Sequence, residues 1–281
     1  MSGETSKVLV LEDSSTQARL ITRMFESVGL GTEVYNSARA FQNVTKSSDS
    51  KIIAALVDVH FGDVNGLTLL EPIRRLWPDI PIIVMTANKT DDYRVLADSR
   101  RLGINLVLPK PFSKEHVAEL VKDIEAIRNT GVRRRHVVII DDSVATRRIA
   151  SAVLSAVGYR VSAFEDGLDA IHRLSFDFVD VVLTDLNMPE MSGDEIIDLV
   201  RDVWGRVGIV AMSGDLKLCK NRALVDGLVP KPFDAPELCR AIELAMPSLH
   251  EPIESLLEGM QEDDAVETGH VDLPEVYELD C

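Results

Sequence analysis

The chain has 281 residues, enough for about two domains of ordinary size, and a hydrophobic content of 46%, enough for packed cores. Its formal net charge is −16, and the sequence shows no basic patch of the kind that marks a nucleic-acid surface. No apolar run approaches the roughly 18 residues of a membrane-spanning helix, so the composition argues against both nucleic-acid and membrane partners.

The cysteines and the N-terminus bear on the cellular compartment. Cys219, Cys239 and Cys281 do not have the spacing of metal ligands or of a redox motif. We therefore interpret them as reduced thiols of a cytoplasmic protein. Residues 1–7 lack the charged and apolar regions of a signal peptide, which favours the same compartment.

In the first half of the chain, predicted strands alternate with predicted helices. Residues 7–11 form an apolar strand that ends at Glu12 and Asp13. A helix is predicted from Ser14 to Gly29, with one apolar face formed by Leu20, Ile21, Met24, Phe25 and Val28. Further strands are predicted near residues 32–35, 52–57, 80–85 and 104–108, with helices between them and after Ser113. This alternation is typical of a parallel sheet.

The second half of the chain repeats the polar landmarks of the first. Strands are again predicted at residues 136–140, 181–184 and 209–212. Four pairs of polar residues recur in the same order at nearly constant offsets: Asp13 and Asp142 are 129 residues apart, Asp58 and Asp185 127, Thr86 and Ser213 127, and Lys110 and Lys231 121. This period is too long for a solenoid, so it indicates a tandem duplication of a whole domain.

The alternation and the repeat together predict the architecture. Each unit reads as five βα pairs, which predicts an α/β protein of two tandem flavodoxin-like, doubly wound (βα)5 domains. Each domain is expected to contain a five-stranded parallel sheet with helices on both faces. We expect the first domain at residues 6–128, a linker at 129–135, the second domain at 136–246 and an acidic tail at 247–281.

Charge is unusual in the linker and in the tail. The run Arg133, Arg134 and Arg135 is interpreted as a solvated linker, with a charge patch for an acidic partner as the alternative. Residues 247–281 hold 11 acidic residues and no Lys or Arg, which predicts a disordered tail that is dispensable for folding. The alternatives are a docking peptide with an apolar patch at residues 253–260, and a clamp on the three arginines.

Five polar residues of the first unit each follow a strand. Because the carboxyl ends of parallel strands meet at one edge of the sheet, Glu12, Asp13, Asp58, Thr86 and Lys110 are predicted to converge on one crevice. Three carboxylates in one crevice repel one another unless a cation joins them, and oxygen-only ligands suit Mg²⁺. A loop aspartate that merely caps the next helix is the alternative for Asp58, and the recurrence of the whole set disfavours it.

This set of residues predicts phosphoryl chemistry. Asp58 is a candidate carboxylate nucleophile that forms an acyl phosphate. Mg²⁺ and Lys110 would offset the charge on the transferring phosphoryl group. Thr86 offers a hydroxyl donor that can move toward the new phosphate, which makes it a candidate switch.

With these motifs, residues 6–246 resemble two copies of the bacterial response-regulator receiver family, of the chemotaxis-regulator type. The resemblance implies that a histidine kinase or a histidine phosphotransfer protein phosphorylates an aspartate in each domain. In the first domain it implies Asp58 as phosphoacceptor, Glu12 and Asp13 as the Mg²⁺ pair, and Thr86 and Lys110 as the phosphoryl-binding residues.

The same roles fall on the second domain at matching positions. There the resemblance implies Asp185 as phosphoacceptor and Asp141 and Asp142 as the metal pair. It implies Ser213 as the hydroxyl residue and Lys231 as the lysine. The family also uses as a metal ligand the backbone carbonyl two residues past the acceptor, which maps to His60 and Asn187. We expect the side chain of His60 to face solvent rather than to bind metal.

Two features depart from the family pattern. The family often has an aromatic residue three positions before the lysine, where this chain has Val107 and Leu228. The interval from hydroxyl to lysine is 24 residues in the first domain and 18 in the second, so the fourth helix of the second domain must be short.

We therefore expect a stand-alone response regulator that is not an enzyme beyond its own phosphorylation and dephosphorylation. It would signal by phosphorylation-dependent binding to an output protein that the sequence does not identify. The alternatives are a phosphate sink or relay intermediate that drains a kinase, and a scaffold with one inactive receiver. Phosphotransfer kinetics with the partner kinase would separate the binding module from the relay.

Overall fold

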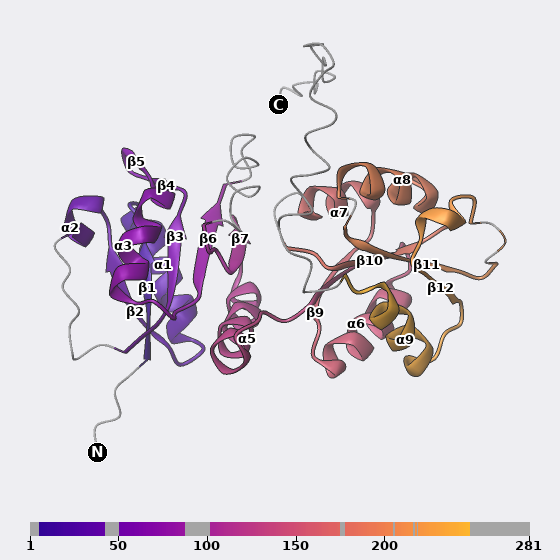
Figure 1. Cartoon of the computed structure of the whole chain (residues 1–281), viewed down its shortest axis with the longest axis horizontal. Coiled ribbons are helices and arrows are strands. Elements are labelled where there is room, and N and C mark those ends of the chain that lie inside the picture. The colour runs from indigo at the N-terminus through magenta and orange to yellow at the C-terminus, as the bar shows by residue number, and fades with distance from the viewer. Residues whose placement is uncertain are drawn as a thin grey trace, which may run out of the picture. The chain divides into compact units, whose positions relative to one another are not determined.

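A computed structural model of the chain describes residues 6–42, 51–87, 102–174, 178–204, 206–215, 217 and 219–247. Two five-stranded parallel sheets run through these residues (Figure 1). The first contains β1 (Ser6–Leu11), β2 (Gly31–Tyr35), β3 (Lys51–Asp58), β6 (Ile82–Thr86) and β7 (Leu106–Pro109). Its strand order, β2-β1-β3-β6-β7, is that of a flavodoxin-like doubly wound sheet.

The second sheet has the same topology. Its strands are β8 (His136–Ile140), β9 (Arg160–Phe164), β10 (Val181–Asp185), β11 (Gly208–Ser213) and β12 (Gly227–Pro230). Their order is β9-β8-β10-β11-β12, so the second strand of the unit again lies at one edge and the first strand beside the third. The two α/β domains predicted from the repeat are therefore confirmed.

Helices cover both faces of each sheet. In the first domain these are α1 (Ser15–Glu26), α2 (Ala38–Gln42), η1 (Gly66–Leu69), α3 (Leu70–Leu76) and α5 (Lys114–Thr130). In the second they are α6 (Val144–Val157), α7 (Gly167–Leu174), α8 (Gly193–Val203), η3 (Arg222–Leu224) and α9 (Ala235–Ala245). Two apolar clusters per domain, one on each face, pack these helices against the sheet. The inner strands are almost wholly buried, which is why they read as continuous apolar runs, whereas the edge strands β2 and β9 are mostly half-buried.

The first helix departs in one respect from its predicted apolar face. Ile21, Met24 and Phe25 are buried, but Leu20 is 54% exposed. Successive helical residues are about 100° apart, so Leu20 turns away from the stripe that its neighbours form. The prediction that Leu20 belongs to the buried face of the helix was wrong, because the apolar character of a residue does not show whether it lies on the side of the helix that faces the sheet.

The fourth helix of the second domain is short, as the 18-residue interval predicted. The helix described between β11 and β12 is the three-residue 3₁₀ helix η3; residue 217 also has 3₁₀ conformation, and residues 216 and 218 beside it lie outside the described part of the chain. Val225 and Leu228 pack against the buried cluster there. Residues 88–101, where the first domain is expected to have its fourth helix, lie outside the described part of the chain.

The linker arginines are not solvated, so that interpretation was wrong. Arg133 and Arg135 donate to Asp180 at 2.7 and 2.8 Å, and Arg134 Nε donates to Asp123 at 2.7 Å. Both carboxylates are almost fully buried, Asp123 at 1% exposed and Asp180 at 4%. Buried carboxylates need counter-charges, and the arginine run supplies them. Because all three arginines are paired with these carboxylates, the alternative that they form a charge patch for an acidic partner has less support.

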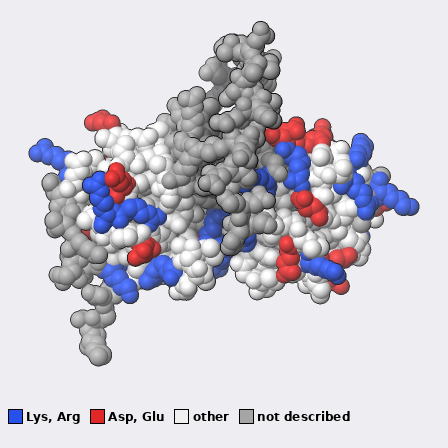
Figure 2. All heavy atoms as spheres, in the orientation of Figure 1, with Lys and Arg blue, Asp and Glu red and all other residues white. Residues whose placement is uncertain are grey.

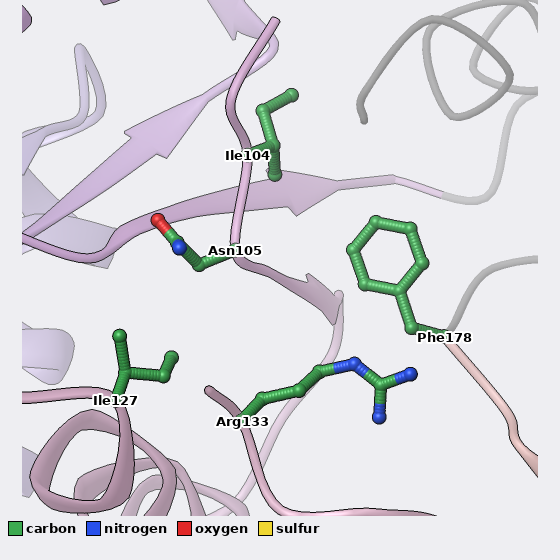
Figure 3. A pocket seen from close by; sticks show the side chains of 5 residues that line it. All are labelled: Ile104, Asn105, Ile127, Arg133 and Phe178. Carbon is green, nitrogen blue, oxygen red and sulfur yellow. The ribbon is translucent and has the colours of Figure 1, made fainter. Parts of the chain in front are cut away.

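Arg133 has a further contact. Its guanidinium lies 5.7 Å from the centre of the Phe178 ring, and both side chains line a small cavity of about 190 Å³ with Ile104, Asn105 and Ile127 (Figure 3).

Figure 2 shows acidic and basic side chains interspersed on the visible face of the described residues. None of the helices described is both long and apolar enough for a bilayer crossing. The tail predictions fall on residues outside the described ranges and stay predictions.

Candidate functional site

Acidic and basic side chains meet at the carboxyl ends of the strands in the first domain. Glu12 and Asp13 follow β1, Asp58 ends β3, and Lys110 follows β7. Carboxylate oxygens of the three acids lie within 4.8 Å of one another. Lys110 Nζ lies 2.6 Å from Asp58 Oδ2 and 2.7 Å from Glu12 Oε2. Four of the five residues predicted to converge, the three acids and Lys110, are thus brought together in the structure.

Backbone amides orient the two buried carboxylates. His60 N donates to Asp58 Oδ1 at 3.2 Å, which leaves Oδ2 of the same carboxylate facing Lys110. Ser14 N donates to Glu12 Oε1 at 3.1 Å, and Oε2 again faces the lysine. Each carboxylate is therefore held at one oxygen by the chain and at the other by the ammonium.

Burial and charge determine the protonation of this crevice. Burial raises the pKa of Glu12 and the nearby charge of Asp58 raises it further, against the opposing effect of Lys110. Burial alone would lower the pKa of Lys110, but its hydrogen bonds to Asp58 and Glu12 outweigh burial, so the pKa is raised. Lys110 therefore stays cationic at neutral pH.

The second domain repeats this arrangement. Carboxylate oxygens of Asp141, Asp142 and Asp185 lie within 4.8 Å of one another. Lys231 Nζ lies 2.7 Å from both Asp141 and Asp185. Asn187 N donates to Asp185 Oδ1 at 3.3 Å. Burial again raises the pKa of Asp141, and hydrogen bonds to Asp141 and Asp185 raise that of Lys231 against burial.

Both crevices fit a hard divalent cation. The donor set is carboxylate oxygen only, which suits Mg²⁺ better than a transition metal. Three acids face a single lysine, so a cation would relieve repulsion that the protein does not otherwise balance. Asp13 and Asp142 are exposed, which gives an ion access from solvent.

The two hydroxyl residues are in different states. Thr86 and Ser213 are both fully buried and accept a backbone hydrogen bond from Lys110 and Lys231 at their carbonyls. Thr86 Oγ1 has no hydrogen-bond partner among the described residues. Ser213 Oγ donates to the carbonyl of Asp215 and accepts from its amide, both at 3.1 Å. A buried hydroxyl without a partner is costly, so Thr86 is poised to gain one.

The residues two positions past the acceptors contribute their backbone amides to the site. His60 is exposed and begins β4 (His60–Phe61), which pairs with β5 (Val64–Asn65) in a short hairpin. Its side chain thus lies at the surface, as expected. Val107, at the position where the family often has an aromatic residue, is buried in β7 at 1% exposed.

Two glycines matter to the site and had not been predicted as functional. A Cβ on Gly66 would lie 1.9 Å from the carbonyl oxygen of Asp58, and one on Gly193 would lie 2.2 Å from that of Asp185. Both glycines stand eight residues after their acceptor, since 66 − 58 and 193 − 185 are both 8. That shared spacing was the available signal. Only glycine lets the helix start approach the acceptor backbone so closely.

Two further side chains differ between the crevices. Gln17 Oε1 accepts a hydrogen bond from Lys110 Nζ at 2.9 Å in the first domain. In the second, Arg147 Nη1 donates to the carbonyls of Asp141 and Asp142 at 2.6 and 2.9 Å. Nothing in the sequence pattern marked either residue.

The fold and the crevices define a class of protein. A doubly wound sheet of this order binds its ligands at the carboxyl ends of its strands, where both acidic crevices lie. The family model of the response regulator receiver domain matches residues 8–122 and 137–243, well over half of the chain. The chain belongs to this family and contains two of its receiver domains.

Several curated proteins share parts of this sequence. Transcription factor SKN7 of Chaetomium thermophilum is 26% identical over 171 residues, which are 57% of this chain and 21% of that protein. Sensor histidine kinase RcsC of Salmonella typhimurium is 31% identical over 93 residues, 33% of this chain and 10% of that protein. The chain thus spans only a small part of these two proteins.

Shorter relatives are covered almost completely. The chemotaxis protein CheY homolog of Campylobacter jejuni is 29% identical over 122 residues, 42% of this chain and 91% of that protein. In a high-resolution structure, chemotaxis response regulator CheY4 of Vibrio cholerae is 27% identical, and the match covers 40% of this chain and 99% of that chain, with a TM-score of 0.39. It is the sequence match that places the chain in the family.

Proposed function

We propose that both receivers accept phosphoryl groups, on Asp58 and on Asp185, from a histidine kinase or a histidine phosphotransfer protein. The protein then signals in the cytoplasm as a stand-alone response regulator, through phosphorylation-dependent binding to an output protein. One observation carries the proposal. In each domain the acceptor carboxylate lies 2.6 or 2.7 Å from a lysine, and within 4.8 Å of it lie carboxylate oxygens of a pair of acids.

The residues have separate parts in this reaction. An oxygen of Asp58 or Asp185 forms a bond to phosphorus, and the bond from phosphorus to the donor breaks with its electron pair leaving on the donor. Lys110 or Lys231 stays protonated and balances charge on the phosphoryl oxygens. Mg²⁺, when bound by the acidic pair and the acceptor, supplies further charge neutralisation. The hydroxyl of Thr86 or Ser213 is the candidate donor to the new phosphate.

The relay role is the second candidate, and the presence of two complete crevices in one chain favours it. A scaffold with one inactive receiver has less support, because neither crevice lacks a residue of the set. A pull-down with and without beryllofluoride, a phosphoryl mimic, tests the binding role. Partner capture that depends on beryllofluoride supports it, whereas fast onward transfer of the phosphoryl group with no such capture supports the relay.

Removing one acid of the metal pair should weaken Mg²⁺ in its own domain only. We expect Asp13→Ala and Asp142→Ala each to weaken one of two Mg²⁺ sites about fivefold or more, since an ion contact at about 4 Å contributes on the order of 1–4 kcal/mol. Titration calorimetry of the full chain measures both sites. Asp63→Ala, at an exposed carboxylate outside the crevice, serves as the control. Unchanged Mg²⁺ affinity in Asp142→Ala would contradict the proposed ligands.

The phosphoryl group should last longer on Asp58 than on Asp185. The resemblance implies that side chains two past the acceptor and two past the hydroxyl flank the attacking water. In the first domain these positions are His60 and Asn88, of which Asn88 lies outside the described residues. In the second domain they are Asn187 and Asp215. The bulk of His60 should hinder the water. Half-lives measured after removal of the phosphoryl donor, in Asp185→Asn and Asp58→Asn chains, test this.

The matched variant for that comparison is His60→Asn, which gives the first domain the side chain of the second. It should shorten the half-life on Asp58 toward that on Asp185. Equal half-lives in the two parent chains would remove the basis for a division of labour between the receivers.

A further inference from the structure

The lysines of the two crevices differ in their hydrogen bonding. Lys110 Nζ contacts three acceptors: Asp58 Oδ2 at 2.6 Å, Glu12 Oε2 at 2.7 Å and Gln17 Oε1 at 2.9 Å. An ammonium group has three donors, so all of them are used. Lys231 Nζ, within the described residues, contacts the corresponding two carboxylates, Asp141 and Asp185, at 2.7 Å. The third acceptor is thus a feature of the first receiver.

Gln17 and Thr146 occupy the same place in the two domains. Each is the third residue after the serine that caps its helix, and each donates its backbone amide to that serine. Gln17 N lies 3.4 Å from Ser14 Oγ, and Thr146 N lies 3.3 Å from Ser143 Oγ. The helix starts are therefore alike, and the difference lies in the side chain. A threonine hydroxyl ends two bonds closer to the backbone than a glutamine amide oxygen.

The chemistry of the contact fixes the orientation of the glutamine amide. An ammonium group can only donate, so the amide oxygen rather than its nitrogen must face Lys110. Gln17 is otherwise exposed, whereas the Lys110 side chain is only 16% exposed. The contact thus ties a largely buried ammonium group to an exposed side chain, in addition to the two buried carboxylates.

We propose that Gln17 is a positioning residue for phosphoryl transfer to Asp58, a device that the second receiver lacks. This inference rests on the proposed function. When an oxygen of Asp58 bonds to phosphorus, the bond from phosphorus to the donor atom breaks and the donor leaves with the electron pair; that atom is a histidine nitrogen in a phosphorylated kinase and an oxygen in acetyl phosphate. Lys110 turns one N–H from Asp58 to a phosphoryl oxygen and remains protonated. Glu12 and Gln17 continue to accept hydrogen bonds from the other two N–H groups, so the ammonium group keeps its orientation toward the phosphoryl oxygen.

The test uses the full chain with Asp185→Asn, so that only Asp58 reports. Acetyl phosphate with Mg²⁺ is the donor, and acetate is the leaving group. Gln17→Met keeps the length of the side chain and helix propensity but removes the acceptor. We expect the initial labelling rate to fall about 3- to 10-fold, the range for one hydrogen bond to a partly exposed charged group. The affinity for beryllofluoride, measured by calorimetry, should fall by a similar factor.

The matched control is Thr146→Met in the full chain with Asp58→Asn, which should leave labelling of Asp185 unchanged. In a Lys110→Met chain, which has no donor for Gln17 Oε1, Gln17→Met should cause no further loss of beryllofluoride affinity, because its effect passes through the ammonium group of the lysine. A further loss of the same size there overturns the inference.

Equal labelling rates and equal beryllofluoride affinities for Gln17→Met and its parent also overturn it, while leaving the proposed function intact. A parent chain that is never labelled on Asp58 overturns the proposed function itself and this inference with it.

Discussion

Replacing Asp58 by Asn is expected to abolish phosphorylation of the first receiver, and Asp185→Asn that of the second. An amide has no carboxylate oxygen to attack phosphorus, so the loss should be complete rather than partial. The fold should survive, because asparagine has the same shape and its neutral side chain removes one charge from a crowded acidic cluster. Mass spectrometry of the chain after treatment with acetyl phosphate and Mg²⁺ should show one label per remaining acceptor, and none in the double variant.

Exposed acids near the acceptors provide the controls. Asp63→Asn and Glu190→Gln change carboxylates in the loops that follow Asp58 and Asp185, and both should leave labelling intact. A label that persists on the first receiver after Asp58→Asn would show that another residue is the acceptor, and would sink the assignment.

The second large effect concerns Asp180, which lies outside both crevices. Its carboxylate accepts hydrogen bonds from Arg133 at 2.7 and 3.0 Å, from Arg135 at 2.8 Å and from the backbone amide of His136 at 2.8 Å. Asp180→Ala leaves these partly buried donors without their acceptor. We expect a loss of about 3–5 kcal/mol in the free energy of unfolding, as for other buried pairs from which one partner is removed.

Urea unfolding followed by tryptophan fluorescence measures this loss. The chain has one tryptophan in each domain, Trp77 and Trp204, so Trp77→Phe leaves a probe for the second domain. Asp169→Ala, at an exposed position of α7, should cost no more than about 0.5 kcal/mol and is the control. A loss of that small size for Asp180→Ala would mean that the arginines find other partners.

The same carboxylate predicts a dependence on pH. Burial alone would raise the pKa of Asp180, but hydrogen bonds and charge from Arg133, with the His136 amide and Arg135, lower it. A pKa that is lowered in the folded state stabilises the fold above the unfolded value of about 3.9, and this contribution is lost as the pH falls through the folded value. The difference in stability between the parent and Asp180→Asn should therefore be constant near neutral pH and shrink below about pH 4.

Much of the fold and most of the candidate site could be predicted from the sequence. Strands buried on both faces must be continuous apolar runs, and a parallel sheet brings their carboxyl ends to one edge. Because Asp58 and Asp185 end such runs, their position at this edge of the sheet could be predicted, and the repeat identified the polar residues that lie beside each of them. The 18-residue interval likewise indicated a short fourth helix, and the helix described in that interval is the three-residue η3.

Only the tertiary structure decided the contacts between distant residues that follow no period. Lys110 and Gln17 are 93 residues apart, and Arg133 and Asp180 are 47 apart. A glutamine in the first turn of a helix, or an arginine run in a linker, has the same local pattern whether or not a partner lies within reach. The sequence by itself determined which strands and helices form and where the strand ends meet. Burial leaves a periodic pattern of apolar residues along the chain, and the end of a strand is marked by the polar residue that follows its apolar run. The structure decided which long side chains pair across those ends, because that depends on distances between elements that no local pattern encodes.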